Sequence, residues 1–148
     1  MPALEVITYS APAELAKLAD RAASVWNDVM QGLAVLKKAG YPHITIKFGS
    51  VDRASDPTRV AQCADHPGKR WTITLANDIK WRLSWWDRVF GRGEDTFACL
   101  VHEFGHIFDL PHSSDPRDVM HPSIGGNGKL SAEESANYRE FFLKHISP

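Results

Sequence analysis

The sequence predicts an α+β protein, on the strength of three observations. Apolar residues recur every three or four positions from Leu15 to Val29, which is the spacing of an amphipathic helix. Apolar and polar residues alternate over 44–48 and 71–75, which is typical of half-buried strands. Two further apolar-periodic stretches, 97–108 and 138–145, predict helices in the second half. Helices therefore flank a group of strands along the chain.

Local signals place the remaining elements and the helix ends. Weaker strand signals cover residues 6–9, 33–36 and 60–64. We expect Ser10 to cap the first helix and Glu94 or Asp95 to cap the second. Ser131 and Glu134 form a capping-box pattern ahead of the last helix.

Composition indicates one ordinary domain covering residues 1–148. A chain of 148 residues with 43% hydrophobic residues suits a single core. The net charge of −1 creates no overall field toward nucleic acid or an anionic membrane, and no apolar run approaches the roughly 20 residues that span a bilayer. We therefore expect a monomer without a nucleic-acid partner or membrane insertion. Residues 1–10 also lack the pattern of a signal peptide.

Two groups of residues allow more than one interpretation. Trp81, Trp85 and Trp86 stand among basic residues, as an exposed platform for a polymer substrate would. We favour a packed loop or short helix whose tryptophans cover the core, because large aromatic side chains are mostly buried. Cys63 and Cys99 are either two small buried hydrophobes or, in an extracellular protein, one disulfide.

The residues that carry chemistry begin at His102-Glu103 and continue to His106. Residues four apart share one face of a helix, so His102 and His106 can direct two imidazoles at one ion. A catalytic zinc site needs a third protein ligand, which His112 supplies if the helix ends after His106 and the chain reverses. Pro111 favours that ending. Glu103 adjoins the first ligand and can reach a water without binding the metal.

The pattern HExxH is short and alone is a weak indication of a metal site. The third histidine and the downstream Asp118-Val119-Met120-His121-Pro122 extend it to the long metzincin motif with its Met-turn. The sequence therefore predicts a zinc site on His102, His106 and His112.

The segment HEFGHIFDLPHSSDPRDVMHP resembles the active site of matrixins, a branch of the metzincins. The beginning, VITYSAPAELAKLADRAASVWN, is also similar to small bacterial peptidases of the snapalysin type. Those carry Asp as the third ligand, so His112 favours the matrixin-like assignment. The resemblance implies a zincin-like domain with a twisted, mostly parallel sheet and an antiparallel edge strand. It also implies a long N-terminal helix, an active-site helix and a C-terminal helix.

The resemblance further implies roles for individual residues and one catalytic Zn²⁺. Met120 would form an apolar floor below the zinc. A protein or peptide substrate would lie along an edge strand formed by Val60, Ala61, Gln62, Cys63 and Ala64. One wall of its pocket would be formed by Pro122, Ser123 and Ile124. Family resemblance favours secretion, although residues 1–10 show no signal peptide.

Three departures from the matrixin pattern matter. Asp109 stands where the family has a glycine that adopts a left-handed backbone, a conformation that costs Asp about 1–2 kcal/mol. The residues that build the structural zinc site of vertebrate matrixins are absent. We therefore expect a single zinc. We also expect no cysteine-switch propeptide ahead of the domain.

The predicted function is a zinc metalloendopeptidase in which Glu103 serves as general base for a zinc-activated water. One alternative is a catalytically inactive zinc-containing binding module of a larger assembly. The other is a hydrolase of peptidoglycan crosslinks.

Overall fold

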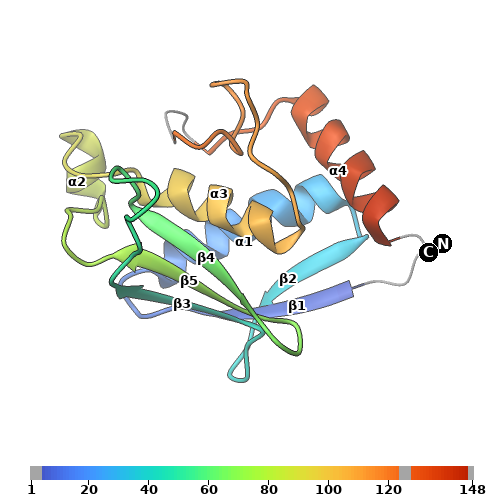
Figure 1. The fold of residues 1–148 in the computed structure, drawn as a ribbon, viewed down its shortest axis with the longest axis horizontal. Helices are drawn as coiled ribbons and strands as arrows, with labels where there is room; N and C mark the ends of the chain where they lie inside the picture. Colours follow the sequence, from blue (N-terminus) through green and yellow to red (C-terminus); the bar gives the residue numbers. More distant parts are fainter. Residues whose placement is uncertain (1–4, 124–127, 147–148) are drawn as a thin grey trace.

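The computed structural model describes residues 5–123 and 128–146 (Figure 1). Its elements follow one another in this order: β1 (Glu5–Ser10), α1 (Ala16–Met30), β2 (Ala34–Lys38), β3 (Ile44–Gly49), β4 (Ala61–His66), β5 (Arg70–Ala76), α2 (Trp85–Val89), α3 (Thr96–Ile107) and α4 (Ala132–Ile146).

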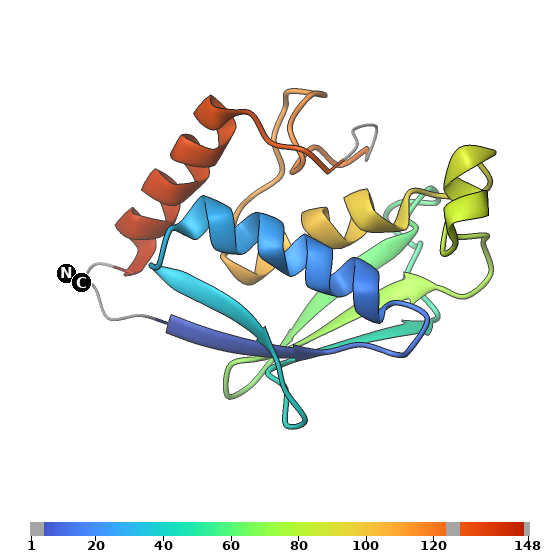
Figure 2. The same cartoon turned by 180° about the vertical axis from the view of Figure 1, so that it is seen from behind.

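The five strands form one sheet in the order β2-β1-β3-β5-β4. The pairs β1–β2, β1–β3 and β3–β5 are parallel, whereas β4 pairs antiparallel with β5. Helices α1 and α3 pack against each other on one side of the sheet, and α4 packs against α1 (Figures 1 and 2). The predicted α+β class, with a mostly parallel sheet and an antiparallel edge strand, is confirmed.

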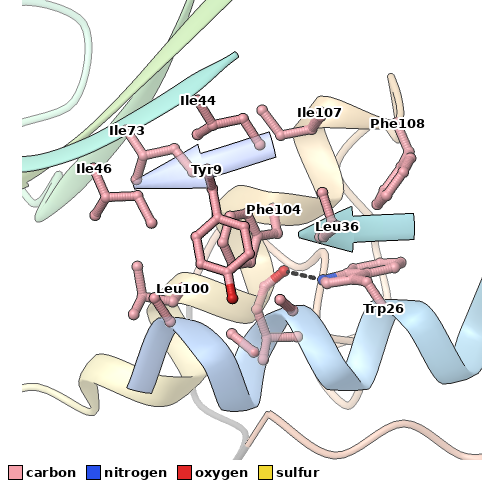
Figure 3. Close-up of a cluster of buried hydrophobic side chains, with 14 of the residues drawn as sticks. Tyr9, Trp26, Leu36, Ile44, Ile46, Ile73, Leu100, Phe104, Ile107 and Phe108 are labelled. Atoms are coloured by element: carbon pink, nitrogen blue, oxygen red, sulfur yellow. Dashed lines mark hydrogen bonds between the residues drawn. The ribbon is translucent and has the colours of Figure 1, made fainter. Parts of the chain in front are cut away.

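The core fills the space between this sheet and the two central helices. Trp26 of α1 is fully buried, and its Nε1 donates to the carbonyl of Val101 in α3 at 2.8 Å (Figure 3). Tyr9 of β1 meets Phe104 of α3 edge-on, with ring centroids 5.7 Å apart. These contacts fix α3, which bears the histidine motif, against both α1 and the sheet.

The helix starts test the predicted caps. Asp95 caps α3, since its side chain accepts a hydrogen bond from the amide of Ala98 at 3.0 Å. The hydroxyl of Ser131 accepts from the amide of Glu134 at 3.1 Å at the start of α4. The prediction for Ser10 was wrong: it ends β1, paired with Thr45 of β3.

The tryptophan-rich segment is divided between core and surface. Trp81 is buried and donates to the carbonyl of Ala76 at 2.8 Å, as the packed interpretation expects. Trp85 and Trp86 are each 58% exposed, so the favoured interpretation is wrong for these two. They belong to the five-residue helix α2, which lies near one end of the molecule, away from the central helices (Figures 1 and 2).

Within the described residues, none of the helices combines the length and the apolar composition needed to cross a membrane. Cys63 and Cys99 are both free thiols. Cys99 is buried in the core, which agrees with the interpretation as a small hydrophobe, whereas Cys63 is only partly buried.

Candidate metal centre and its cleft

The first two histidines of the motif lie on the buried helix α3. His102 is only 3% exposed, and His106 is partly exposed one turn later. Because they stand four residues apart, their rings share one face of the helix, with centroids 4.9 Å apart. The sequence therefore positions this pair through helix geometry alone.

His112 arrives through a chain reversal directly after α3. Asp109 has a φ of +61°, the left-handed conformation. The amide of Asp109 donates to the backbone carbonyl of His106 at 3.1 Å, and the amide of Leu110 donates to the carbonyl of Gly105 at 3.3 Å. These are the two hydrogen bonds of a Schellman motif, in which a left-handed residue follows the helix. The reversal brings one ligand nitrogen from each of the three histidines to within 4.8 Å of the others.

Backbone carbonyls determine which ring nitrogens remain free. Nδ1 of His102 lies 2.7 Å from the carbonyl oxygen of Val119, and Nδ1 of His106 lies 3.1 Å from that of Leu110. A carbonyl only accepts hydrogen bonds, so each Nδ1 carries the proton and each Nε2 keeps its lone pair. Burial lowers the pKa of His102 to about 4, which keeps the ring neutral, and burial also lowers the pKa of His106.

This arrangement fits a zinc ion. The Nε2 atoms of His102 and His106 lie 3.3 Å apart, so their lone pairs repel each other unless a cation lies between them. Two nitrogens on a tetrahedral zinc are separated by about 3.3 Å, given the usual Zn–N distance. Imidazoles with a hydrogen-bonded Nδ1, such as those of His102 and His106, are also the ligand type that zinc sites use.

Glu103 is a buried carboxyl group beside the first histidine. It is 5% exposed, and its Oε2 has no hydrogen-bond partner among the described residues. Burial raises the pKa of this carboxyl group, the positive charge of Arg59 lowers it by less, and the resulting pKa is about 7. A buried acceptor with a free oxygen at a cleft is suited to receiving a proton.

The chain after the third histidine forms a tight turn that supports the cluster. The amide of Ser113 donates to the carbonyl of Met120 at 2.9 Å, and the hydroxyl of Ser113 donates to Asp118 at 2.6 Å. Met120 is fully buried below α3, where its sulfur occupies the space that a Cβ on Gly105 would need. Its predicted place as an apolar floor is compatible with this burial.

Glu134 of α4 supports the same turn from the other side. Its Oε2 accepts hydrogen bonds from the amide of Val119 at 2.8 Å and from the hydroxyl of Tyr138 at 2.7 Å. The sequence indicated Glu134 only as part of a capping box. Its contact with the turn depends on the packing of α4, which local sequence does not encode.

An open cleft of about 660 Å³ runs beside the histidines. Several predicted substrate-contacting residues line it, namely Val60, Ala61, Gln62, Cys63, Pro122 and Ser123. Ala64 is not among the lining residues, and Ile124 lies outside the described residues. Strand β4 begins at Ala61, one residue later than predicted, although the carbonyl of Val60 still accepts from the amide of Ala76 at 2.8 Å.

The cleft also contains charged residues that the sequence did not single out for it. They are Asp56, Arg59, Asp65, Glu94 and Asp109. Cys63 faces this environment with its pKa raised to about 12, first by burial and then by the charges of Glu103 and Asp65, so its thiol is protonated at neutral pH. No local pattern marks Asp56, Arg59 and Asp65 as cleft residues, because they come from separate loops and strands.

Comparison with known proteins gives matches centred on one family. The family described as Matrixin matches residues 5–139. Matrix metalloproteinase-25 of Homo sapiens is 53% identical over 36 residues, which cover 24% of this chain and 6% of that protein. Matrilysin of Felis catus is 38% identical over 63 residues, 40% of this chain and 24% of that protein. Macrophage metalloelastase of Oryctolagus cuniculus is 40% identical over 40 residues, 27% of this chain and 8% of that protein. The matched segments thus span at most 24% of these relatives' own length.

Proposed function

The chain belongs to the matrixin family, and from this premise we propose that it is a zinc-dependent endopeptidase with its catalytic centre at His102, His106 and His112. One observation carries the proposal: three histidines with ligand nitrogens within 4.8 Å lie in an open cleft beside the buried carboxyl group of Glu103. Metal ligands alone would serve a structural site equally well. The adjacent unpartnered carboxyl oxygen and the open cleft favour catalysis.

The three histidines would hold the ion through nitrogens that carry lone pairs, while Val119 and Leu110 fix the rings of His102 and His106. A bound zinc would supply Lewis acidity, which acidifies a water molecule and polarises the scissile carbonyl. Glu103 accepts the proton of the attacking water at its free Oε2 and returns it to the leaving amine. The residue is thereby restored at the end of each cycle.

The edge strand β4 would bind the substrate backbone. Among the described strands, β4 pairs only with β5, and Ala61, Gln62 and Cys63 line the cleft. An extended peptide can add to such an edge through backbone hydrogen bonds, while side-chain pockets provide specificity. Pro122 and Ser123, which line the cleft, would form one wall for the residue after the scissile bond.

The decisive variant is Glu103→Ala. It should keep its zinc and lose nearly all turnover, because the ligands remain while the proton acceptor is gone. Glu140→Ala, on an exposed residue of α4, is the matched control and should retain full activity. Substantial hydrolysis by zinc-loaded Glu103→Ala would disprove the role of Glu103.

A substrate screen separates this function from its alternatives. An endopeptidase cleaves a peptide library, and a chelator or a hydroxamate stops the reaction; product sequencing then gives the preferred residue after the scissile bond. An inactive binding module would bind zinc and cleave nothing. A crosslink hydrolase would release products from peptidoglycan and leave the library intact.

A further inference from the structure

The segment around α2 displays an apolar surface that the proposed reaction does not use. Five exposed side chains within eight residues form what we call the α2 patch: Leu83, Trp85, Trp86, Val89 and Phe90. The ring centroids of Trp85 and Trp86 lie 4.6 Å apart, and the rings of Trp86 and Phe90 are stacked with their centroids 6.1 Å apart. Single exposed hydrophobic residues are ordinary, but a contiguous aromatic group marks an interaction surface.

Hydrogen bonds hold the base of the α2 patch to the start of α3. The amide of Arg82 donates to the backbone carbonyl of Glu94 at 2.9 Å, and the amide of Glu94 donates to the backbone carbonyl of Lys80 at 2.9 Å. The hydroxyl of Thr96 donates to the carbonyl of Arg82 at 2.8 Å. Trp81 anchors the same base in the core. The patch is therefore presented on a fixed support.

The charge around the α2 patch differs from that of the whole protein. Residues 80–92 contain four basic residues and one acidic residue, a net charge of +3. The next two acidic residues are Glu94, which lines the cleft, and Asp95, which caps α3. The complete chain carries −1, so the other residues together carry −4. Asp87 lies 3.8 Å from Arg92 and offsets one of the cations. An anionic partner would consequently be drawn to this end of the molecule.

Shape and charge together select among the candidate partners. The helix α2 lies near one end of the long axis (Figure 1). Its described side chains line neither the cleft nor a second cavity at Trp71 and Phe108. A second copy of the patch would bring like charges together, and a neutral polymer would leave the cations unused. A bilayer with anionic lipids accepts aromatic rings at its headgroup level and pairs cations with its phosphates.

We propose that the α2 patch docks this protein on the surface of an anionic lipid bilayer. Trp85, Trp86 and Phe90 enter the headgroup region, while the neighbouring cations meet lipid phosphates. Association is peripheral and independent of the proposed peptidase activity. Glu94 lines the cleft and is bonded to the base of the patch, so docking brings one end of the cleft close to the membrane.

The test is co-sedimentation of the full chain with two kinds of vesicle. One kind is phosphatidylcholine alone, and the other is an equal mixture of phosphatidylcholine and phosphatidylglycerol. At low salt we expect the affinity for the anionic vesicles to be about a hundredfold higher than for the neutral ones. Each of the three net positive charges raises this affinity by about fivefold. Tryptophan emission should shift to shorter wavelength on binding, because Trp85 and Trp86 leave water.

Two variants make the test specific. Trp85→Ser/Trp86→Ser should weaken binding to anionic vesicles by at least about tenfold. Tyr41→Ser removes an aromatic ring that is more exposed than either tryptophan, in the β2–β3 loop, and should bind like the wild type. Both changes are at exposed side chains, and unchanged thermal unfolding and zinc content verify that each variant is folded.

Other results would overturn the proposal. Equal binding to both kinds of vesicle, binding to neither, or binding unaffected in Trp85→Ser/Trp86→Ser would each do so. Binding of a single-stranded oligonucleotide without vesicle binding would assign the patch to nucleic acid. Concentration-dependent dimers that disappear in the double variant, again without vesicle binding, would assign it to a second copy.

Discussion

Glu134 and His102 are linked through a single residue, Val119. The amide of Val119 donates to the Glu134 carboxylate at 2.8 Å, and its carbonyl accepts the Nδ1 proton of His102 at 2.7 Å. A residue of the C-terminal helix thus fixes the orientation of a predicted zinc ligand. Outer contacts of this type commonly tune metal affinity.

Removing this support should weaken both the fold and the metal site. Glu134→Ala leaves the amide of Val119 and the hydroxyl of Tyr138 without their acceptor, which costs about 1–3 kcal/mol of unfolding free energy. Zinc affinity should fall by up to about tenfold, and Glu134→Gln should restore part of it. Urea unfolding and zinc titration measure the two effects. Glu133→Ala, at the exposed neighbour, is the control, and identical behaviour of the two alanine variants would refute the link.

The third histidine should determine whether zinc binds tightly. His112→Ala leaves two ligands, and zinc affinity should drop by more than about a hundredfold. Zinc should raise the melting temperature of the wild type and a chelator should reverse this, because the ion binds only the folded state. The variant should show little of this dependence, while His66→Ala, at an exposed histidine outside the cluster, should retain it. Unchanged metal content in His112→Ala would require a different third ligand.

Gly105 should resist even the smallest substitution. A Cβ at this position overlaps the sulfur of Met120 and comes within 3.0 Å of Trp26. Gly105→Ala should therefore destabilise the protein by about 1–3 kcal/mol, although alanine is favoured over glycine by about 1 kcal/mol in an ordinary helix. Gly40→Ala, where a Cβ meets nothing within 4 Å, should change stability little. A Gly105→Ala protein as stable as the wild type would show that Met120 repacks freely.

Asp109 should be a position where glycine stabilises the fold. Its φ of +61° is unfavourable for Asp by about 1–2 kcal/mol, whereas glycine adopts it freely and loses about 0.5–1 kcal/mol through its more flexible unfolded chain. Asp109→Gly should thus raise the unfolding free energy by up to about 1 kcal/mol and leave zinc binding intact. Asp109→Ala should give no gain, because alanine keeps the Cβ. Destabilisation by Asp109→Gly would mean that the aspartate side chain stabilises the turn.

Local sequence determined most of the fold and brought forward the predicted metal ligands. The helical spacing of His102 and His106, the alternation in β3 and β5 and the cap at Asp95 depend on neighbours a few residues away. Asp109 at the end of α3 was also identifiable, since a left-handed residue is needed to deliver His112. Ser10 misled the prediction because pairing with Thr45 in the sheet outweighed its preference for a cap.

Tertiary structure alone decided the environment of these residues. Segments far apart in the chain supply the carbonyl that fixes the imidazole of His102, the contact of Glu134 with Val119 and the charged lining of the cleft. The same holds for the tryptophans: Trp81 reaches the core, whereas Trp85 and Trp86 remain in solvent on a short projecting helix. Periodicity reports which face of an element is apolar, but burial depends on whether another element packs against that face.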